Sequence, residues 1–260
     1  GRLMRSRRGI AVAGTHGKST VTAMLAELLI RAQLDPTVVF GAAPLGRRSG
    51  GRSGRGPLML VEACGYRANL LHLRPEQAVI LGIEPDHFDC FPTTEALESA
   101  FCRFAANVPE SGRLLIPETC HASRRAAAAA RCCVETFGLT PQADWSAHHL
   151  KDVCGRFHFS IYHHGRPWGD VRLAVPGRHN VLNALAAAAV ARQNGLAPAE
   201  IAAGLGQFRG LHRRLEALGC WRGATLVDDY AHHPTEVAAG LAAVRRMYPG
   251  RRIWCVFQPP

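Results

Sequence analysis

The chain has 260 residues, of which 47% are hydrophobic and 20% are charged, as is typical of a globular protein with an apolar core. No apolar run reaches the roughly 18 residues of a membrane-spanning helix, which argues against an integral membrane protein. The formal net charge of +11 comes almost wholly from arginine and favours anionic ligands, including nucleotides. Because no aromatic residues are interleaved with the arginine clusters, we expect no dedicated nucleic-acid binding.

The cysteines and the two chain ends suggest a cellular setting. Nine cysteines are scattered without a CxxC pair, which favours a reduced, cytoplasmic protein with buried thiols. The basic start superficially resembles a signal peptide, but its apolar stretch is short and continues into His16 and Lys18. The chain starts without Met and stops just after a strand-like stretch, so we expect a piece of a longer protein.

The first predicted elements are a strand, a glycine turn and a helix. Residues 10–12 are apolar, residues 14–17 form the turn, and residues 18–33 repeat apolar side chains at helical spacing. This order is typical of a phosphate-binding loop, in which backbone N–H groups, a lysine and a hydroxyl meet phosphate and Mg²⁺. The predicted loop residues are Gly14, Thr15, His16, Gly17, Lys18, Ser19 and Thr20.

Two details bear on this loop. The general motif has a glycine five residues before Gly17, where this chain has Val12. Lys18, on the other hand, is one of only two lysines in an arginine-rich chain. A lysine at this position is therefore a strong candidate for a functional residue.

Strands and helices continue to alternate after this unit. Short strands are predicted at residues 37–40, 58–61 and 77–82, and an amphipathic helix at residues 93–108 begins at a threonine cap. The alternation predicts a doubly wound, mostly parallel α/β sheet, in which ligands bind at the carboxyl ends of the strands. Lys18, Glu62 and His87 each follow such an end, so we expect these three side chains to converge.

The Gly- and Arg-rich stretch at residues 41–57 has no packing pattern. We interpret its arginines as a solvated loop, with a ligand clamp as the alternative. Residues 113–175 predict short strands in a small β-rich elaboration of the same domain, and its histidines lack metal-ligand spacing and are interpreted as surface residues. The four histidines are His148, His149, His163 and His164.

Helices are predicted at residues 179–194 and 198–208, and the composition changes near residue 210. Strands at residues 215–221 and 224–227, a polar loop, a helix ending at Tyr248 and a strand at residues 252–257 then follow. We expect this segment to begin a second, Rossmann-like α/β domain.

Several polar residues have both a structural and a nucleotide-binding interpretation. Asn180 and Asn183 share a helix face, where they could stabilise the helix start or contact a nucleotide. Arg213 and Arg214 could hold a γ-phosphate, and Asp229 could hold the ribose hydroxyls. His87 could be a loop residue or an unusual Mg²⁺ ligand beside Glu62.

Six motifs in this order resemble the Mur ligase family. They are GTHGKST, the strand-end Glu62, EPDHFDCF, PGRHNVLNA, FRGLHRRLE and VDDYAHHPTEV. The phosphate loop of that family also lacks the early glycine. The resemblance covers nearly the whole chain and implies a central ATP-binding ligase domain at residues 1–210. It also implies the truncated start of an amino-acid-binding C-terminal domain at residues 211–260.

The resemblance implies an ATP-dependent amide ligase of peptidoglycan precursor synthesis that uses Mg²⁺. Within the family it is closest to the branch that joins L-alanine to UDP-N-acetylmuramate through an acyl phosphate. It implies that Lys18 and Arg214 act on the transferred phosphoryl group and that Ser19, Glu62 and His87 hold Mg²⁺. The remaining implied contacts are Asn180 and Asn183 to the nucleotide, Asp229 to its ribose, and His232 and His233 to the incoming amino acid.

The chain also departs from the family pattern. Gly65 and Arg67 stand where related ligases carry further acidic residues, and no lysine lies between His87 and Lys151. The UDP-sugar-binding N-terminal domain is absent, so we expect this piece to bind nucleotide without turnover. Two alternatives stay open, namely a ligase that attaches a recycled tripeptide to the same sugar and a nucleotide-binding module without ligase activity. Folylpolyglutamate synthase is disfavoured by the HHPTE motif.

Overall fold

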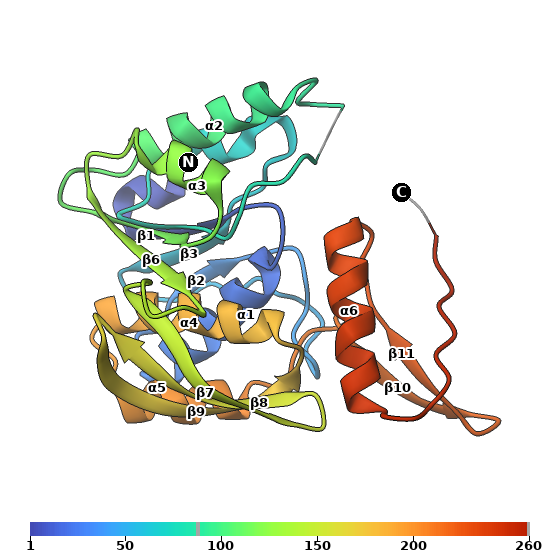
Figure 1. Cartoon of the computed structure of the whole chain (residues 1–260). Coiled ribbons are helices and arrows are strands. Elements are labelled where there is room, and N and C mark those ends of the chain that lie inside the picture. Colours follow the sequence, from blue (N-terminus) through green and yellow to red (C-terminus); the bar gives the residue numbers. More distant parts are fainter. Residues whose placement is uncertain (87–88, 259–260) are drawn as a thin grey trace.

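The larger part of the chain forms one twisted sheet covered by helices on both faces (Figure 1). The structure is a computed structural model that describes residues 1–86 and 89–258. Within these residues the sheet order is β2-β3-β1-β4-β5-β6-β7-β8-β9. Neighbouring strands are parallel from β2 to β7, and β7, β8 and β9 pair antiparallel. The predicted doubly wound, mostly parallel α/β sheet is confirmed.

The elements have the following bounds. The strands of the main sheet are β1 (Arg8–Ala13), β2 (Thr37–Val39), β3 (Leu58–Glu62), β4 (Gln77–Ile80), β5 (Arg113–Pro117), β6 (Cys133–Gly138), β7 (Trp145–Val153), β8 (Arg156–His163) and β9 (Arg166–Pro176). The helices are η1 (Leu3–Ser6), α1 (Lys18–Arg31), η2 (Tyr66–His72), α2 (Thr94–Ala106), α3 (His121–Ala127), α4 (His179–Gln193), α5 (Pro198–Gln207) and α6 (Pro234–Met247). A separate pair of strands comprises β10 (Glu216–Trp221) and β11 (Ala224–Asp228).

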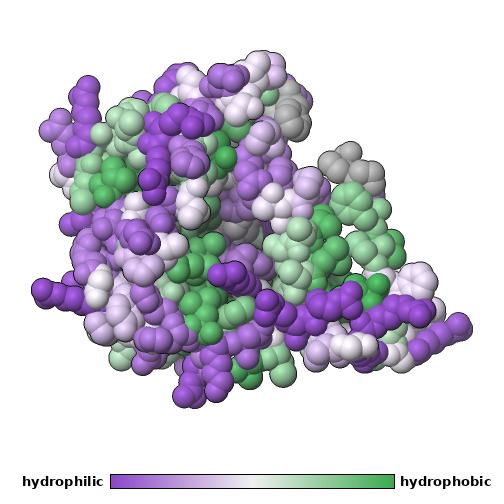
Figure 2. Space-filling model, viewed as in Figure 1, coloured by the Kyte–Doolittle hydropathy of each residue, from purple (hydrophilic) through white to green (hydrophobic). Residues whose placement is uncertain are grey.

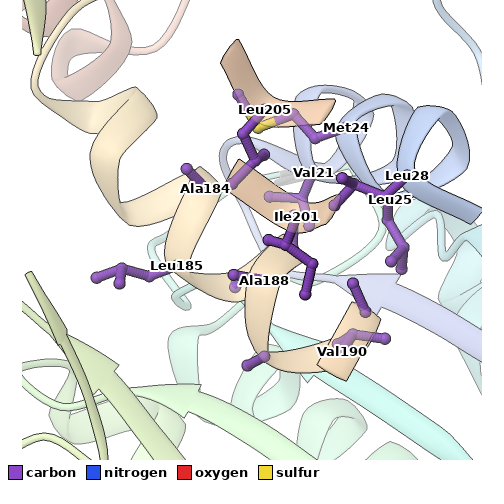
Figure 3. Close-up of a cluster of buried hydrophobic side chains, with 14 of the residues drawn as sticks. Val21, Met24, Leu25, Leu28, Ala184, Leu185, Ala188, Val190, Ile201 and Leu205 are labelled. Carbon is purple, nitrogen blue, oxygen red and sulfur yellow. The ribbon is translucent and has the colours of Figure 1, made fainter. Parts of the chain in front are cut away.

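Helices α1, α4 and α5 cover one face of the sheet with a continuous apolar core (Figure 3). Helix α4 is alanine-rich, and residues 184–191 are almost completely buried. A helix that is apolar all round belongs inside a core. The small side chains of α4 let α1 and α5 pack closely against it. Helices α1 and α5 also approach each other closely, since an added Cβ at Gly204 in α5 would come within 2.4 Å of Leu28 Cδ2 in α1.

The opposite face is covered by α2, α3 and η2. Helix α2 begins where the sequence predicts, because the hydroxyl of Thr93 accepts a hydrogen bond from the N–H of Ala96 at 3.2 Å. This bond satisfies one of the N–H groups that a helix start leaves without an intrahelical partner.

The β-rich part is smaller than the sequence suggests. Strands β5 and β6 belong to the parallel main sheet, with α3 as the crossover between them. Only β7, β8 and β9 form an antiparallel extension, and β7 joins them to the edge of β6. The sequence of residues 113–117 and 133–138 does not indicate that these strands pair in parallel, because parallel pairing depends on the helix that connects them.

The C-terminal part lies beside the main body and contains β10, β11 and α6 (Figure 1). The predicted strands at residues 215–221 and 224–227 are confirmed as an antiparallel pair. The predicted strand at residues 252–257 is wrong, since this segment has no regular structure in the described chain. Trp254 and Val256 are 82% and 99% exposed, and an extended segment without a neighbouring strand has no ladder to join.

No helix among residues 1–86 and 89–258 combines the length and the apolar character that crossing a membrane requires.

The packing of Leu28 predicts a large cost for its truncation. Leu28 is 1% exposed between α1, α4 and α5, so Leu28→Ala should lower the free energy of unfolding by about 2–5 kcal/mol. Leu218→Ala, at a leucine that is 60% exposed, is the matched control and should change it by less than about 0.5 kcal/mol. Urea unfolding measures both, and equal effects would contradict the assigned packing.

Candidate functional site

The glycine turn between β1 and α1 has a backbone that only glycine adopts easily. Gly14 has φ +125° and Gly17, the residue before α1, has φ +79°. A Cβ at Gly17 would come within 2.6 Å of Asn183 Oδ1. The turn therefore exposes the N-terminus of α1 in the way that an anion-binding loop requires.

Lys18 lies folded over this turn. Its Nζ donates hydrogen bonds to the carbonyl oxygens of Gly14 and Thr15, each at 2.8 Å. Burial lowers the pKa of Lys18, and the nearby Glu62 and Asp86 charges oppose this effect. An anionic ligand at the turn would further compensate this buried ammonium group.

Ser19 and Glu62 meet as the sequence predicts. Ser19 Oγ lies 3.0 Å from both carboxylate oxygens of Glu62, and Gly41 N–H donates to Glu62 Oε2 at 3.1 Å. A hydroxyl and a carboxylate at the end of a strand are hard oxygen donors of the kind that Mg²⁺ prefers. The third predicted ligand, His87, lies outside the described residues.

Asn180 and Asn183 at the start of α4 are both buried. Asn183 Nδ2 donates to Asn180 Oδ1 at 2.9 Å, and Asn180 Nδ2 donates to the carbonyl oxygen of Pro176 at 2.6 Å. The amides thus stabilise the helix start, as the structural interpretation holds. They also face the phosphate loop through the contact of Asn183 with Gly17.

A cavity of about 200 Å³ lies between the main body and the C-terminal part, where the surface is hollowed (Figure 2). Its walls come from the phosphate loop, the start of α4, the segment around residues 208–215 and the start of α6. The predicted site residues that line it are His16, Gly17, Ser19, Thr20, Asn180, Asn183, Arg214 and Asp229.

A network of charged groups joins the phosphate loop to the C-terminal part. His16 Nδ1 lies 3.2 Å from Glu236 Oε1, and His16 Nε2 lies 3.4 Å from Glu84 Oε2. Thr235 Oγ1 donates to the same oxygen of Glu84 at 2.6 Å. Neither glutamate was predicted to contact His16, although Glu84 begins the motif EPDHFDCF and Glu236 ends the motif HHPTE.

The charges of this network depend on one another. Burial alone would raise the pKa of Glu236, but the hydrogen bond from His16 and the charge of Arg214 lower it to about 2. Burial alone would lower the pKa of His16, but Glu236 and Glu84 outweigh it and raise this pKa. The side chains of His16 and Glu236 therefore form a partly buried ion pair between the pKa of Glu236, about 2, and the raised pKa of His16.

Arg214 and Asp229 lie on the C-terminal side of the cavity. Arg214 is 3.8 Å from Glu236 Oε1, and its guanidinium lies 5.6 Å from the ring centre of Tyr230. Burial raises the pKa of Asp229, against the effect of the Arg214 charge. His179, which the sequence analysis did not select, also lines the cavity, and burial beside Arg214 lowers its pKa.

The two histidines expected near the amino acid occupy different places. His233 accepts a hydrogen bond from Thr235 N–H at 3.3 Å, and its ring centre lies 4.5 Å from that of His16. The side chain of His232 is 39% exposed, with Nδ1 3.0 Å from the carbonyl oxygen of Tyr230. Neither residue lines the cavity.

Comparison with known families identifies the fold of both parts. The Mur ligase middle domain matches residues 60–191 of this chain, which is just over half of its length. The chain belongs to the Mur ligase family. The family's glutamate ligase domain matches residues 213–259. These two ranges leave a gap at residues 192–212, between α4 and β10.

Curated Mur ligases match along the whole chain. A UDP-N-acetylmuramate–L-alanine ligase from Desulfitobacterium hafniense is 40% identical over 259 residues, which are 100% of this chain and 57% of that protein. One from Chlorobium phaeovibrioides is 42% identical over 260 residues, which are 100% of this chain and 55% of that protein. The chain thus spans little more than half the length of these relatives.

Solved Mur ligases share the fold. The UDP-N-acetylmuramate–alanine ligase from Thermotoga maritima has a TM-score of 0.79 at 25% identity, over 95% of this chain and 56% of that one. The murein peptide ligase from Psychrobacter arcticus has a TM-score of 0.76 at 26% identity, over 99% of this chain and 58% of that one.

The His16–Glu236 pair in this Mur ligase chain predicts a pH-dependent stability. Because the pKa of His16 is raised in the folded protein, the pair's contribution to the free energy of unfolding is complete below pH 6.5. This contribution is lost as the pH rises through the pKa of His16 in the folded protein. The lowered pKa of Glu236 gives one that is complete above pH 4.5 and is lost as the pH falls towards about 2. The difference in free energy of unfolding between wild type and Glu236→Gln should therefore be largest between pH 4.5 and 6.5.

Urea unfolding across this pH range tests the pair, with Glu98→Gln as the control. Glu98 pairs with Arg125, and the arginine keeps its charge over this pH range. The difference in free energy of unfolding between wild type and Glu98→Gln should therefore stay constant above pH 4.5. The Glu236→Gln difference should shrink above pH 6.5 to the part contributed by Arg214 and by the hydrogen bond from the N–H of His232. A Glu236→Gln difference that also stayed constant there would contradict the ion pair.

Proposed function

We propose that this chain is the nucleotide-binding core of an ATP-dependent ligase that joins L-alanine to UDP-N-acetylmuramate in the cytoplasm. The observation that carries the proposal is the phosphate loop, with Lys18 over the turn and the Ser19–Glu62 pair beside it. The identity of 40–42% along the whole chain to ligases of that name supports the substrates.

The proposal assigns ATP binding to residues 1–210 and the approach of the amino acid to residues 211–260. The separate pairing of β10 with β11 supports this division. Because the cavity has walls from both parts, a ligand bound there would hold them together. A Mur ligase from Thermotoga maritima with the same fold was solved in complex with ADP.

The donor set fits a magnesium nucleotide. Ser19 and Glu62 offer oxygen ligands, and His87 completes the proposed metal set. When bound, the magnesium nucleotide supplies the phosphoryl group that activates the substrate carboxylate. Lys18 and the N–H groups at the start of α1 neutralise and orient the phosphate oxygens. The turn around the phosphates is formed by Gly14, Thr15, His16 and Gly17. Thr20 lies at the edge of the cavity.

The remaining residues orient the other groups in this proposal. Asn180 and Asn183 contact the nucleotide from the start of α4, and Asp229 accepts hydrogen bonds from the ribose hydroxyls. Arg214 stabilises charge on the transferred phosphoryl group from the C-terminal side. His232 and His233 lie at the side from which the amine approaches.

A tripeptide-recycling ligase is the second candidate, because murein peptide ligases share the fold at 26–28% identity. The solved alanine ligase from Thermotoga maritima is similar at 25% identity, so solved structures do not separate the two. L-alanine is favoured because the relatives that match the whole chain at 40–42% identity are named alanine ligases. Steady-state assays of the whole gene product with L-alanine and with tripeptide distinguish the two. A preference for tripeptide would overturn the amino-acid assignment, and the absence of phosphate release with either would favour a binding module.

Lys18→Ala in the whole gene product should reduce ATP-dependent ligation at least about 100-fold, because one preorganised positive charge at the phosphates is lost. Lys151→Ala removes the only other lysine, on the exposed surface of β7, and should keep full activity. Phosphate release with UDP-N-acetylmuramate and L-alanine measures both variants. Turnover retained in Lys18→Ala would refute the assignment.

Glu62→Ala should abolish the Mg²⁺-dependent part of the activity, because a carboxylate ligand is lost. Glu76→Ala, at a glutamate that pairs with Arg8 away from the turn, is the matched control. The measurement is the ligation rate against Mg²⁺ concentration. An unchanged Mg²⁺ response in Glu62→Ala would exclude Glu62 as a ligand.

A further inference from the structure

A second cluster of charged and imidazole groups lies far from the cavity. Glu135 in β6 meets His163 at the end of β8 and His164 in the turn to β9. Gln193, at the last turn of α4, contacts this cluster, whereas Asn180 at the first turn lines the cavity. At about 1.5 Å per residue these two ends of α4 are about 20 Å apart.

The turn between β8 and β9 explains why two adjacent histidines face one point. Adjacent residues of a strand project to opposite faces. His164, however, has φ +49° and Gly165 has φ +72°, the left-handed pair of a two-residue hairpin turn. The turn brings the rings of His163 and His164 to a centroid distance of 4.1 Å. The side chain of His163 is partly exposed at 22%, and that of His164 is exposed at 58%.

The spacing of the three polar atoms suits a metal ion. Glu135 Oε1 lies 3.2 Å from His163 Nε2 and 3.6 Å from His164 Nε2. Tetrahedral Zn²⁺ with bonds of about 2.0–2.1 Å holds any two ligand atoms about 3.3 Å apart. Small side-chain rotations would therefore place all three atoms at bonding distance from one ion.

Each of these side chains is oriented by a further partner. His164 Nδ1 lies 3.1 Å from Asp144 Oδ1, and Glu135 Oε2 accepts a hydrogen bond from Gln193 Nε2 at 3.1 Å. The ring of His163 stacks on Trp145 at 4.0 Å. A carboxylate on the far nitrogen of a histidine is the usual arrangement behind a metal-binding imidazole.

The charge balance also points to a cation. Glu135 is 8% exposed, and within residues 1–86 and 89–258 its ion pairs are with the two histidines and with no lysine or arginine. A buried carboxylate requires compensation, which a divalent cation supplies. The side chain of His164 is 58% exposed and leaves a path for the ion from solvent.

We propose that Glu135, His163 and His164 bind one divalent transition-metal ion of the Zn²⁺ type, separate from the nucleotide cavity. Two imidazole nitrogens and one carboxylate oxygen are borderline ligands that suit such an ion better than Mg²⁺. The ion joins β6 to the β8–β9 turn beside the end of α4. Its function is to stabilise the antiparallel extension of the sheet, and it does not depend on the ligase assignment.

Titration of the full 260-residue chain with Zn²⁺ and, in parallel, with Co²⁺ tests the site. Wild type should bind one equivalent at this site, and the Co²⁺ complex should show d–d bands of a nitrogen- and oxygen-ligated ion. Glu135→Gln and His164→Gln should each weaken this binding at least about tenfold. Zn²⁺ should raise the melting temperature of wild type and not that of these variants.

The adjacent histidines of β7 provide the control, because His148→Gln/His149→Gln removes two imidazoles from the same extension. The control should bind Zn²⁺ like wild type. His164 is at an exposed turn, so His164→Gln tests the site even where Glu135→Gln impairs folding. No saturable binding in wild type, unchanged binding in His164→Gln, or a sulfur-to-cobalt charge-transfer band from the free cysteines would overturn the proposal.

Discussion

The close approach of Gly17 to Asn183 is the contact on which the rest of the structure depends. It brings the starts of α1 and α4 together where both line the cavity. The approach is possible because Gly17 has no side chain and because α4 is built largely of alanine. Core packing and the geometry of the site are thus set by the same two helices.

A second link joins the two parts of the chain across the cavity. His16 belongs to the phosphate loop, Glu84 follows β4, and Glu236 lies in the first turn of α6. In a site that binds phosphate, the same loop that meets the ligand also contacts the C-terminal part. Besides His16, Glu236 has Arg214 at 3.8 Å and the N–H of His232 at 3.4 Å, so this glutamate joins the loop to groups of the C-terminal part.

The sequence predicted the parts of the site that follow local patterns. Lys18, Ser19 and Glu62 were found because a glycine turn and a strand end mark them, and parallel pairing of β1 with β3 brings them together. Glu84 and Glu236 were missed as partners of His16 because they lie 68 and 220 residues away from it in the sequence. The strand expected at residues 252–257 failed for the same reason, since strand formation depends on a neighbour that local patterning does not reveal.

The two ends of the buried helix α4 lie at two separate groups of polar side chains. Its first turn presents amides to a cavity suited to a phosphorylated ligand, and its last turn presents Gln193 to the Glu135 carboxylate. Between them, residues 184–191 are fixed in the core and leave the helix no room to shift. An ion bound by Glu135, His163 and His164 would therefore stiffen the sheet extension against which α4 packs. The start of α4, and with it Asn183 beside Gly17, would be held more firmly by the same contacts.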